Sequence, residues 1–346
     1  MRVVYIVIGC DTDPDRAGLV GRVEDGSLSW RGLTEGIPHL KESVHGLSDD
    51  RGTDPVFTWL LRVDEQVRVI HGSYSWVLEA HGEMLQQLEL SGDELGWHPH
   101  FWRYNSEASF WSQDAEDIAW QVDMLREAHK SFMNIFPGRA KSVRMGWDYH
   151  NNETFQTLEQ LGVRVDFSAI PGLRTLSASH HNLRENLFDW FATPRRPYLP
   201  SRQDYRRPAE ANEDATTVVE APNFTSSSFV WGLASGLQFA RKMKSIKQLT
   251  QAIRRPTYWI NITGRPKLFN PLLSQLRRDL RGTGDETMFF VTYFHPDELL
   301  ANKSSLYDLV SVRINLERII QTCRAEATKV EFIRAVEIPR LTLHGS

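Results

Sequence analysis

The hydrophobic pattern of the chain predicts strands and helices in alternation. Several runs of apolar or β-branched residues have the length of a strand. They are residues 3–9, 56–61, 95–98, 142–147, 163–169, 217–222, 258–263 and 288–294. Between some of them the apolar residues recur with helical spacing, as in 115–135 and 153–161, and the second of these segments meets a C-cap residue at Gly162.

The alternation favours an α/β fold with a parallel sheet, and this number of strand–helix units favours a closed or nearly closed barrel. We therefore expect a distorted (β/α)7-8 barrel of parallel strands over residues 1–300, with a long polar loop inserted near 196–216. Residues 301–346 would add a helix near 306–325 and an edge strand within 329–338, both packed on the barrel.

The composition argues against a polyanionic partner. Lysine and arginine number 40 against 44 acidic residues, for a net charge of -4, so we expect neither nucleic acid nor an anionic membrane surface as a partner. The basic segments 226–256 and 268–281 fit solvated helix faces. No apolar run approaches the length of a membrane span, and the first residues have the pattern of a strand rather than of a signal peptide. With Cys10 and Cys323 as the only cysteines, we expect a soluble, cytoplasmic protein, whose oligomeric state the sequence does not indicate.

The predicted strands end in chemically active side chains. In a β/α barrel the carboxyl ends of the strands, with the loops that follow, form the active face. The groups found there are "CDTDPD", "RVDEQ", "HPH", "RMGWDYH", Asp166, "EAPN", "NIT" and "FHPDE". One such residue alone is more often a helix cap, a turn residue or a satisfied core group, and for Asp64 we expect a loop cap or a surface pair. Together, these aspartates, histidines and the arginine would meet at one open end of the barrel. The carboxylates and imidazoles there could bind a metal such as zinc, and the remaining groups could serve acid–base chemistry.

Four of these motifs, in order, resemble those of the polysaccharide deacetylase family, carbohydrate esterase family 4, which has the NodB-homology fold. They are "DTD" after the first strand, a histidine motif opening after "DELGWH", "RMGW" and "FHPDEL". The resemblance implies a distorted barrel that uses a divalent metal, usually zinc, to hydrolyse N- or O-acetyl groups on sugars. It also implies a role for each matching residue: Asp11 as catalytic base, Asp13 and His98 as metal ligands, Arg144 as the residue that orients Asp11, and His295 as the acid that protonates the leaving group.

The histidine motif departs from the family pattern. Its histidines usually stand four residues apart, and the position four after His98 is Trp102. His100 either replaces the missing metal ligand, the interpretation we favour, or lines the sugar site while water or another carboxylate completes the metal shell.

Further candidates would contact a sugar through an aromatic face or an amide. They are Trp97, Trp102, Trp147 and Asn261, and packing explains each of them equally well. The leading functional hypothesis is metal-dependent removal of acetyl groups from an amino-sugar glycan or its precursor, with a carbohydrate as the partner. Two alternatives stay open: a carbohydrate-binding or assembly protein that has lost catalysis, and a hydrolase of another C–N bond, such as that of a cyclic amide.

Overall fold

A curled sheet of parallel strands forms the centre of the protein. The computed structural model describes residues 2–15, 28–107, 110–175, 187–234, 250, 253–254, 256–282, 287–300 and 306–343. The strands of the sheet are β1 (Val3–Thr12), β2 (Thr58–Leu61), β3 (Glu94–Trp97), β6 (Ser142–Val143), β7 (Val165–Asp166), β10 (Val219–Glu220), β11 (Thr287–Phe294) and β12 (Lys329–Phe332). Their order is β10-β7-β6-β3-β2-β1-β11, and β12 pairs with the first half of β1. Every pair in this sheet is parallel.

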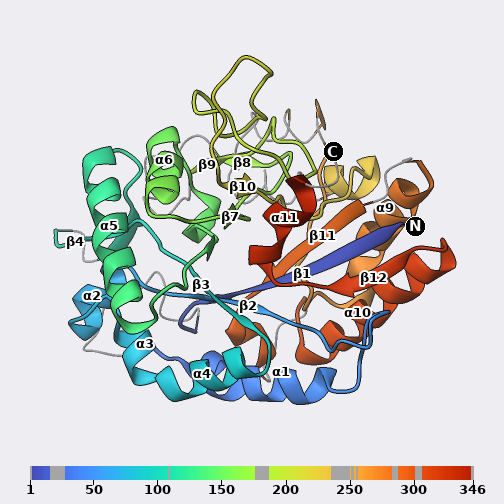
Figure 1. Ribbon diagram of the computed structural model, residues 1–346, viewed down its shortest axis with the longest axis horizontal. Helices are drawn as coiled ribbons and strands as arrows, with labels where there is room; N and C mark the ends of the chain where they lie inside the picture. Colours follow the sequence, from blue (N-terminus) through green and yellow to red (C-terminus); the bar gives the residue numbers. More distant parts are fainter. Residues whose placement is uncertain are drawn as a thin grey trace.

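Helices flank this sheet along the chain (Figure 1). They are α1 (Ile37–Val44), α2 (Glu65–His71), α3 (Trp76–Ala80), α4 (Gly82–Leu90), α5 (Ile118–Ile135), α6 (Asn152–Gln160), α9 (Pro266–Gly282), α10 (Leu309–Ala325) and α11 (Ile338–Leu343). Short turns of π- or 3-10 helix are η2 (Gly32–Gly36), η3 (Gly146–Asp148), η4 (Pro296–Leu299) and η5 (Ala335–Glu337). Two small antiparallel pairs lie outside the main sheet: β4 (Trp102–Asn105) with β5 (Phe110–Gln113), and β8 (Arg174–Thr175) with β9 (Phe188–Asp189).

The alternation of side chains along β1 explains how the sheet places its charged residues. Ile6 and Ile8 belong to the large core cluster that includes the helices. Val7 belongs to a second cluster, to which β2, β7, β10 and β11 also contribute, so it faces the concave side. Gly9 faces the same side, where a Cβ atom would lie 2.5 Å from the ring of Phe167, so only glycine fits there. The next position on this side is Asp11, at the carboxyl end of the strand.

The predicted fold class is confirmed, since the parallel strands curl as a distorted β/α barrel does. Predicted helices 115–135 and 153–161 correspond to α5 and α6, and Gly162 has the expected left-handed conformation with φ 78°. The strand predicted at 258–263 is wrong. Tyr258 makes one isolated antiparallel bridge, after which the chain turns. Most of the predicted segment 226–256 lies outside the described residues.

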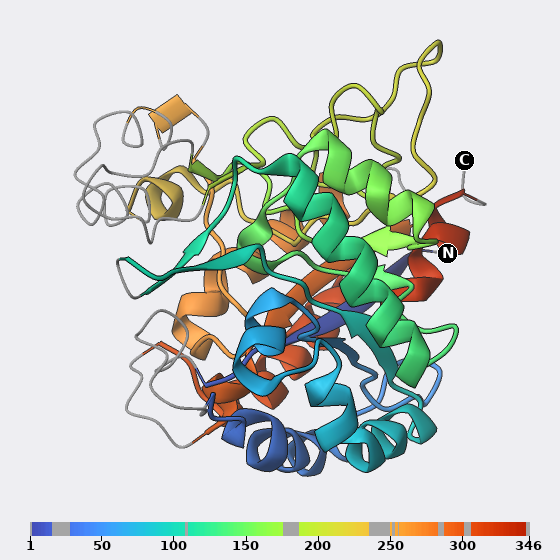
Figure 2. The ribbon, with the colours of Figure 1, turned by 90° about the vertical axis from the view of Figure 1, so that its left-hand side faces the viewer.

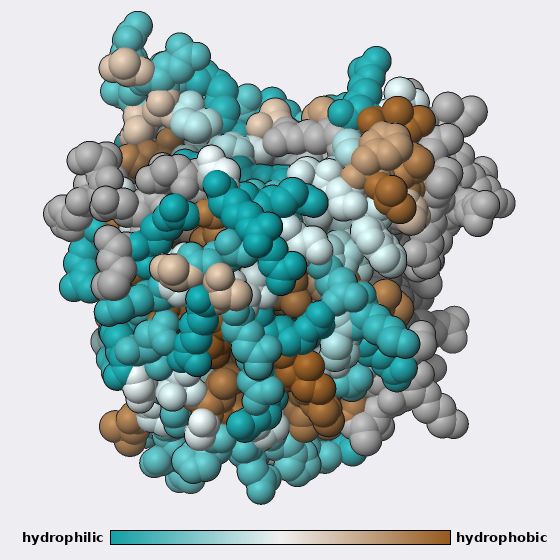
Figure 3. Space-filling view, turned by 90° about the vertical axis from the view of Figure 1, so that its right-hand side faces the viewer, coloured by the Kyte–Doolittle hydropathy of each residue, from teal (hydrophilic) through white to brown (hydrophobic). Residues whose placement is uncertain are grey.

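The helices, the surface and the two cysteines were also considered in the sequence, and the structure describes each of them. Among the described residues, none of the helices is both long enough and apolar enough to cross a membrane. On the face shown in Figure 3, hydrophilic residues predominate and hydrophobic ones form separate patches. Cys10 and Cys323 are both buried and free.

Candidate functional site

The side chains predicted to do chemistry converge at the carboxyl ends of the strands. Figure 2 views the ribbon from the side toward which β1 runs in Figure 1. Asp11 and Asp13 come from the end of β1, His98 and His100 follow β3, and His295 follows β11. Asp13 Oδ1 lies 3.7 Å from His98 Nε2 and 3.3 Å from His100 Nε2. His295 Nε2 lies 3.7 Å from Asp11 Oδ2 and 3.8 Å from Asp13 Oδ2. The structure thus brings together residues that are far apart in the sequence.

Asp13, His98 and His100 form a buried cluster of the kind that holds a metal ion. Each offers one ligand atom, and these atoms all lie within 4.8 Å of one another. His98 Nδ1 is 2.5 Å from the carbonyl oxygen of Arg144, which can only accept, so Nδ1 carries the proton and the lone pair of Nε2 faces the cluster. This fixed orientation is typical of metal-binding histidines.

The charges around Asp13 keep its carboxyl group ionised. Burial alone would raise its pKa, but hydrogen bonds from His100 and His98 and the charge of Arg62 outweigh this effect and hold the pKa of the carboxyl well below its ordinary value. Burial, reinforced by the nearby Arg62 guanidinium, lowers the pKa of His100 well below its ordinary value, and so favours the neutral imidazole. An ionised carboxylate with imidazole nitrogens beside it is a donor set that suits a divalent cation.

Arg62 was not among the predicted site residues. Its guanidinium is fully buried and lies 2.6 Å from Asp13 Oδ1, 2.6 Å from Asp64 Oδ2 and 2.9 Å from Gln66 Oε1. Asp64 also caps α2, because its side chain accepts the N–H of Val67, and it is buried rather than part of a surface pair. The motif "RVDEQ" contained Arg62, but the pairing with Asp13 spans 49 residues and has no local signal.

The predicted base, Asp11, is held by an arginine. Arg144 donates to Asp11 Oδ2 and, through its other terminal nitrogen, to Asp148, while its guanidinium lies 3.4 Å from the ring centre of Tyr293. Burial opposes the charge of Arg144, yet Asp11 and its other neighbours raise the pKa of the guanidinium. The other oxygen, Asp11 Oδ1, is buried and has no hydrogen-bond partner among the residues that the structure describes. Asp11 therefore has one oxygen fixed and one available to a ligand.

Asp148 is a second carboxylate of this site that the sequence did not single out. It stands in the turn η3, where Trp147 and Asp148 both have φ 57°. Burial raises the pKa of Asp148 to about 6, although Arg144 acts in the opposite direction. Arg144 thus connects two carboxylates, of which Asp11 is closer to the histidines.

His295 is the most accessible of the clustered groups, with 18% of its side chain exposed. Its Nδ1 lies 3.4 Å from Oε1 of Glu298, which is buried. Glu298 also accepts from the amide of Asn261, at 2.9 and 3.1 Å, and from the hydroxyl of Thr263, at 2.5 Å. The amide nitrogen of Asn261, predicted to contact a sugar, is therefore directed at Glu298.

The three tryptophans predicted to contact a sugar differ in accessibility. Trp97 is fully buried and donates to the carbonyl of Val63 at 2.9 Å. Trp102 is 1% exposed, and its indole N–H donates to Nδ1 of His100 at 2.6 Å. Trp147 packs edge-to-face on Trp102, with 5.6 Å between ring centroids, and is partly exposed. Trp147 is therefore the best placed of the three to meet a ligand.

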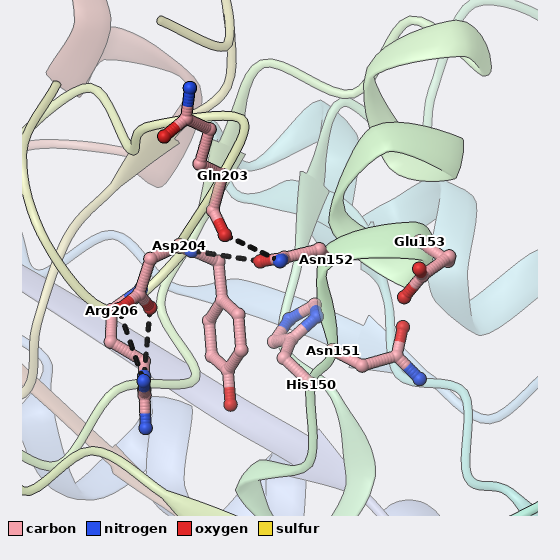
Figure 4. Close-up of a pocket in the computed structure, with 8 residues that line it drawn as sticks. His150, Asn151, Asn152, Glu153, Gln203, Asp204 and Arg206 are labelled. Carbon is pink, nitrogen blue, oxygen red and sulfur yellow. Dashed lines mark hydrogen bonds and ion pairs between the residues drawn. The ribbon is translucent and has the colours of Figure 1, made fainter.

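A separate pocket, of about 330 Å³, lies at the start of α6 and beside the 196–216 loop. Figure 4 shows that several of its polar groups already pair with one another. The amide of Asn152 donates to the carbonyl of Gln203 at 2.7 Å, and Arg206 pairs with Asp204 at 2.8 Å. None of the predicted site residues lines this pocket.

Comparisons with known proteins agree with this fold. No family model matches the sequence, and no curated protein matches it. The structure is similar to a candidate glycoside hydrolase/deacetylase from Parabacteroides distasonis, at 14% identity and a TM-score of 0.54, over 99% of this chain and 71% of that one. It is also similar to a candidate polysaccharide deacetylase from Mycobacterium smegmatis, at 13% identity and a TM-score of 0.51, over 99% of this chain and 90% of that one.

A third similar structure is that of PuuE allantoinase, at 10% identity and a TM-score of 0.51, over 97% of this chain and 89% of that one. The fold implied by the sequence motifs is thereby confirmed, because the chain shares the architecture of polysaccharide deacetylases. At these identities the likeness concerns the fold, and the chemistry has to be argued from the site itself.

Proposed function

We propose that this protein is a metal-dependent hydrolase that removes acetyl groups from an amino-sugar glycan or its precursor. The observation that carries the proposal is the convergence of Asp11, Asp13, His98 and His295 at the carboxyl ends of the strands, on a fold shared with deacetylases. The two free, buried cysteines are compatible with action in the cytoplasm.

The residues of the cluster fit a divalent cation, which we expect to be zinc. Asp13 is ionised and His98 presents a lone pair, so these two would hold the metal, and His100 lies beside them in the same cluster. When bound, such an ion polarises the acetyl carbonyl and makes water acidic enough to be deprotonated near neutral pH.

The chain itself would move the protons. The Asp11 oxygen that has no hydrogen-bond partner would accept the proton of the attacking water, while Arg144 keeps the other oxygen in place. His295 would donate a proton to the nitrogen of the leaving amine, which leaves poorly unless it is protonated. Its Nε2 faces the two aspartates, and Glu298 on the Nδ1 side would keep the ring in that orientation.

A second candidate is hydrolysis of a cyclic amide. The fold similarity to PuuE allantoinase favours it, because the same acid, base and metal ligands would serve the opening of a C–N bond in a ring. The alternative of a binding protein without catalysis is disfavoured because Asp11, Arg144 and His295 are all present and in mutual reach.

Acetate release from a panel of acetylated amino sugars and oligosaccharides tests the proposal. Protein loaded with Zn²⁺ should release acetate, chelation should abolish the release, and Asp13→Ala should remove both metal and activity. A panel of cyclic amides assayed in parallel distinguishes the second candidate. Glycan binding without any hydrolysis by the metal-loaded protein would instead support the non-catalytic alternative.

A further inference from the structure

A continuous chain of hydrogen bonds connects Trp102 with the carbonyl of Arg144 through both histidines. The indole Nε1 of Trp102 lies 2.6 Å from His100 Nδ1. His100 Nε2 lies 3.0 Å from His98 Nε2, and His98 Nδ1 lies 2.5 Å from the carbonyl oxygen of Arg144. Each contact joins two ring nitrogens or a ring nitrogen and a carbonyl, so the position of each proton can be deduced from the ends of the chain.

The two ends fix the direction of every bond. An indole N–H can only donate, so His100 Nδ1 must accept, and His100 must carry its single proton on Nε2. A carbonyl oxygen can only accept, so His98 carries its proton on Nδ1 and has its lone pair on Nε2. In the metal-free protein the bond between the histidines then runs from His100 Nε2–H to His98 Nε2, and every contact pairs a donor with an acceptor. With His98 Nε2 on a metal, the same N–H of His100 would donate to Asp13 Oδ1, which lies 3.3 Å from His100 Nε2.

These assignments separate the roles of the two histidines. A neutral imidazole binds a metal ion through an unprotonated nitrogen, and the nitrogen of His100 that faces Asp13 is the protonated one. We propose that Trp102 keeps His100 from acting as a metal ligand and makes it a hydrogen-bond donor to the cluster. The inference rests on the proposed function, in which Asp13 and His98 hold the metal.

The residues around His100 hold its ring in the position that accepts the Trp102 hydrogen bond. Its backbone N–H donates to Asp64 Oδ2 at 3.0 Å, and its ring lies against Gly146, where a Cβ atom would be 2.1 Å from His100 Cγ. The rings of Trp102 and His100 are nearly parallel, with an interplanar angle of 12°, and both residues are buried. His100 can therefore change its tautomer only if the Trp102 bond is lost.

Trp102→Phe tests the proposal because it keeps an aromatic ring and removes the N–H. Freed from Trp102, His100 can place its proton on Nδ1 and offer Nε2 to the metal. We expect the Zn²⁺ affinity of this variant, measured by competition with a chromophoric chelator, to rise by about tenfold or more, the scale at which groups around a metal site act. His100→Ala should cancel this gain in the Trp102→Phe background and change the affinity of the wild-type protein far less.

Trp111→Phe is the matched control. Trp111 is a fully buried tryptophan on the neighbouring strand β5, and its indole N–H has no hydrogen-bond partner among the described residues. We expect this variant to bind Zn²⁺ as the wild type does. The proposal is overturned if Trp102→Phe leaves the affinity unchanged, or if His100→Ala weakens wild-type binding as much as His98→Ala does.

Nitrogen NMR of the metal-free wild-type protein measures which nitrogen of each histidine carries the proton. This result does not depend on whether Trp102→Phe folds. The His100 signals, assigned by their loss in His100→Ala, should show the proton on Nε2, and those of His98 should show it on Nδ1. A His100 ring protonated on Nδ1 contradicts the proposal. If these tautomers are found but no variant binds Zn²⁺, the metal in the proposed function is wrong while the control of His100 by Trp102 stands.

Discussion

Buried polar side chains around His295 determine which of its nitrogens can face a substrate. Glu298 accepts from Asn261 and Thr263 and lies beside His295 Nδ1, so a proton on Nδ1 would be stabilised and Nε2 would be left toward Asp11. This makes Glu298 a positioning residue, which acts on the reaction only through His295.

Glu298→Gln should therefore lower kcat and leave KM nearly unchanged. The amide keeps the shape of the carboxylate but weakens the bond to His295. We expect a loss of roughly tenfold to a hundredfold, by analogy with carboxylates that orient metal-binding histidines. Steady-state kinetics on the best acetylated substrate measures it. Asp297→Asn, one residue away on the same turn η4, is the control, and equal kinetics for the two variants would contradict the role.

The same residues show what the sequence could and could not predict. Asp11, Asp13, His98 and His295 were found because each stands at a strand end within a short motif. Glu298 was also visible in "FHPDEL", but its partners Asn261 and Thr263 are 37 and 35 residues away. A pairing across that distance depends on how the loops fold and leaves no pattern in the local sequence.

The turn η3 between β6 and α6 connects two of the site's loops. At Gly146 the backbone passes so close to His100 that an added Cβ would lie 2.1 Å from its ring. The backbone N–H of Gly146 donates to the carbonyl of Pro99 at 2.8 Å, which ties the loop after β6 to the loop after β3. The position of His100 thus depends on a residue with no side chain.

Gly146→Ala should displace His100 and destabilise the protein. Overpacking of a buried contact costs about 1–3 kcal/mol, so the midpoint of chemical denaturation should fall accordingly. Gly82→Ala is the matched control, because a Cβ there meets nothing within 4 Å and α4 begins at this residue. A Gly146→Ala variant as stable as Gly82→Ala would show that the His100 ring moves without cost.

The lengths of the strands were harder to predict than their existence. The apolar runs at 142–147, 163–169 and 217–222 gave only two-residue strands, β6, β7 and β10. Beyond β6 the backbone leaves the ladder, and the N–H of Met145 donates to the hydroxyl of Ser168 instead of to a neighbouring strand. Apolar residues in these segments pack in the core after the backbone ladder has ended, and hydrophobicity does not distinguish the two cases.

Acid should destabilise the whole molecule through His129. This histidine on α5 packs against Trp97, and burial, with a smaller effect of Lys141, lowers its pKa from 6.5 to about 4. Between these values the unfolded chain binds a proton that the folded protein does not bind, so stability is lost as the pH falls from about 6.5 to about 4.

His129→Gln replaces the side chain that takes up the proton, so it should weaken the dependence of stability on pH between about 4 and 6.5. Denaturant unfolding at a series of pH values measures it. The control is His39→Gln, since His39 is exposed. If the two variants lose stability equally steeply between pH 6.5 and 4, the acid sensitivity of the fold comes from other groups.

The division of labour between the two aspartates is the central claim about the whole molecule. Asp13 lies in the cluster with His98 and His100 that could hold a metal ion. Asp11 instead accepts a hydrogen bond from Arg144 with one oxygen, and its other oxygen has no hydrogen-bond partner among the described residues. Asp11→Asn is nearly isosteric, so the variant should fold and bind the metal as the wild type does.

The most direct test is to measure acetate release and metal content together for wild type and Asp11→Asn. The account predicts full metal content in both, and a loss of acetate release in Asp11→Asn of roughly two to four orders of magnitude, the range that general-base catalysis supplies. An Asp11→Asn protein that is as active as the wild type, or one that has lost its metal, would contradict it.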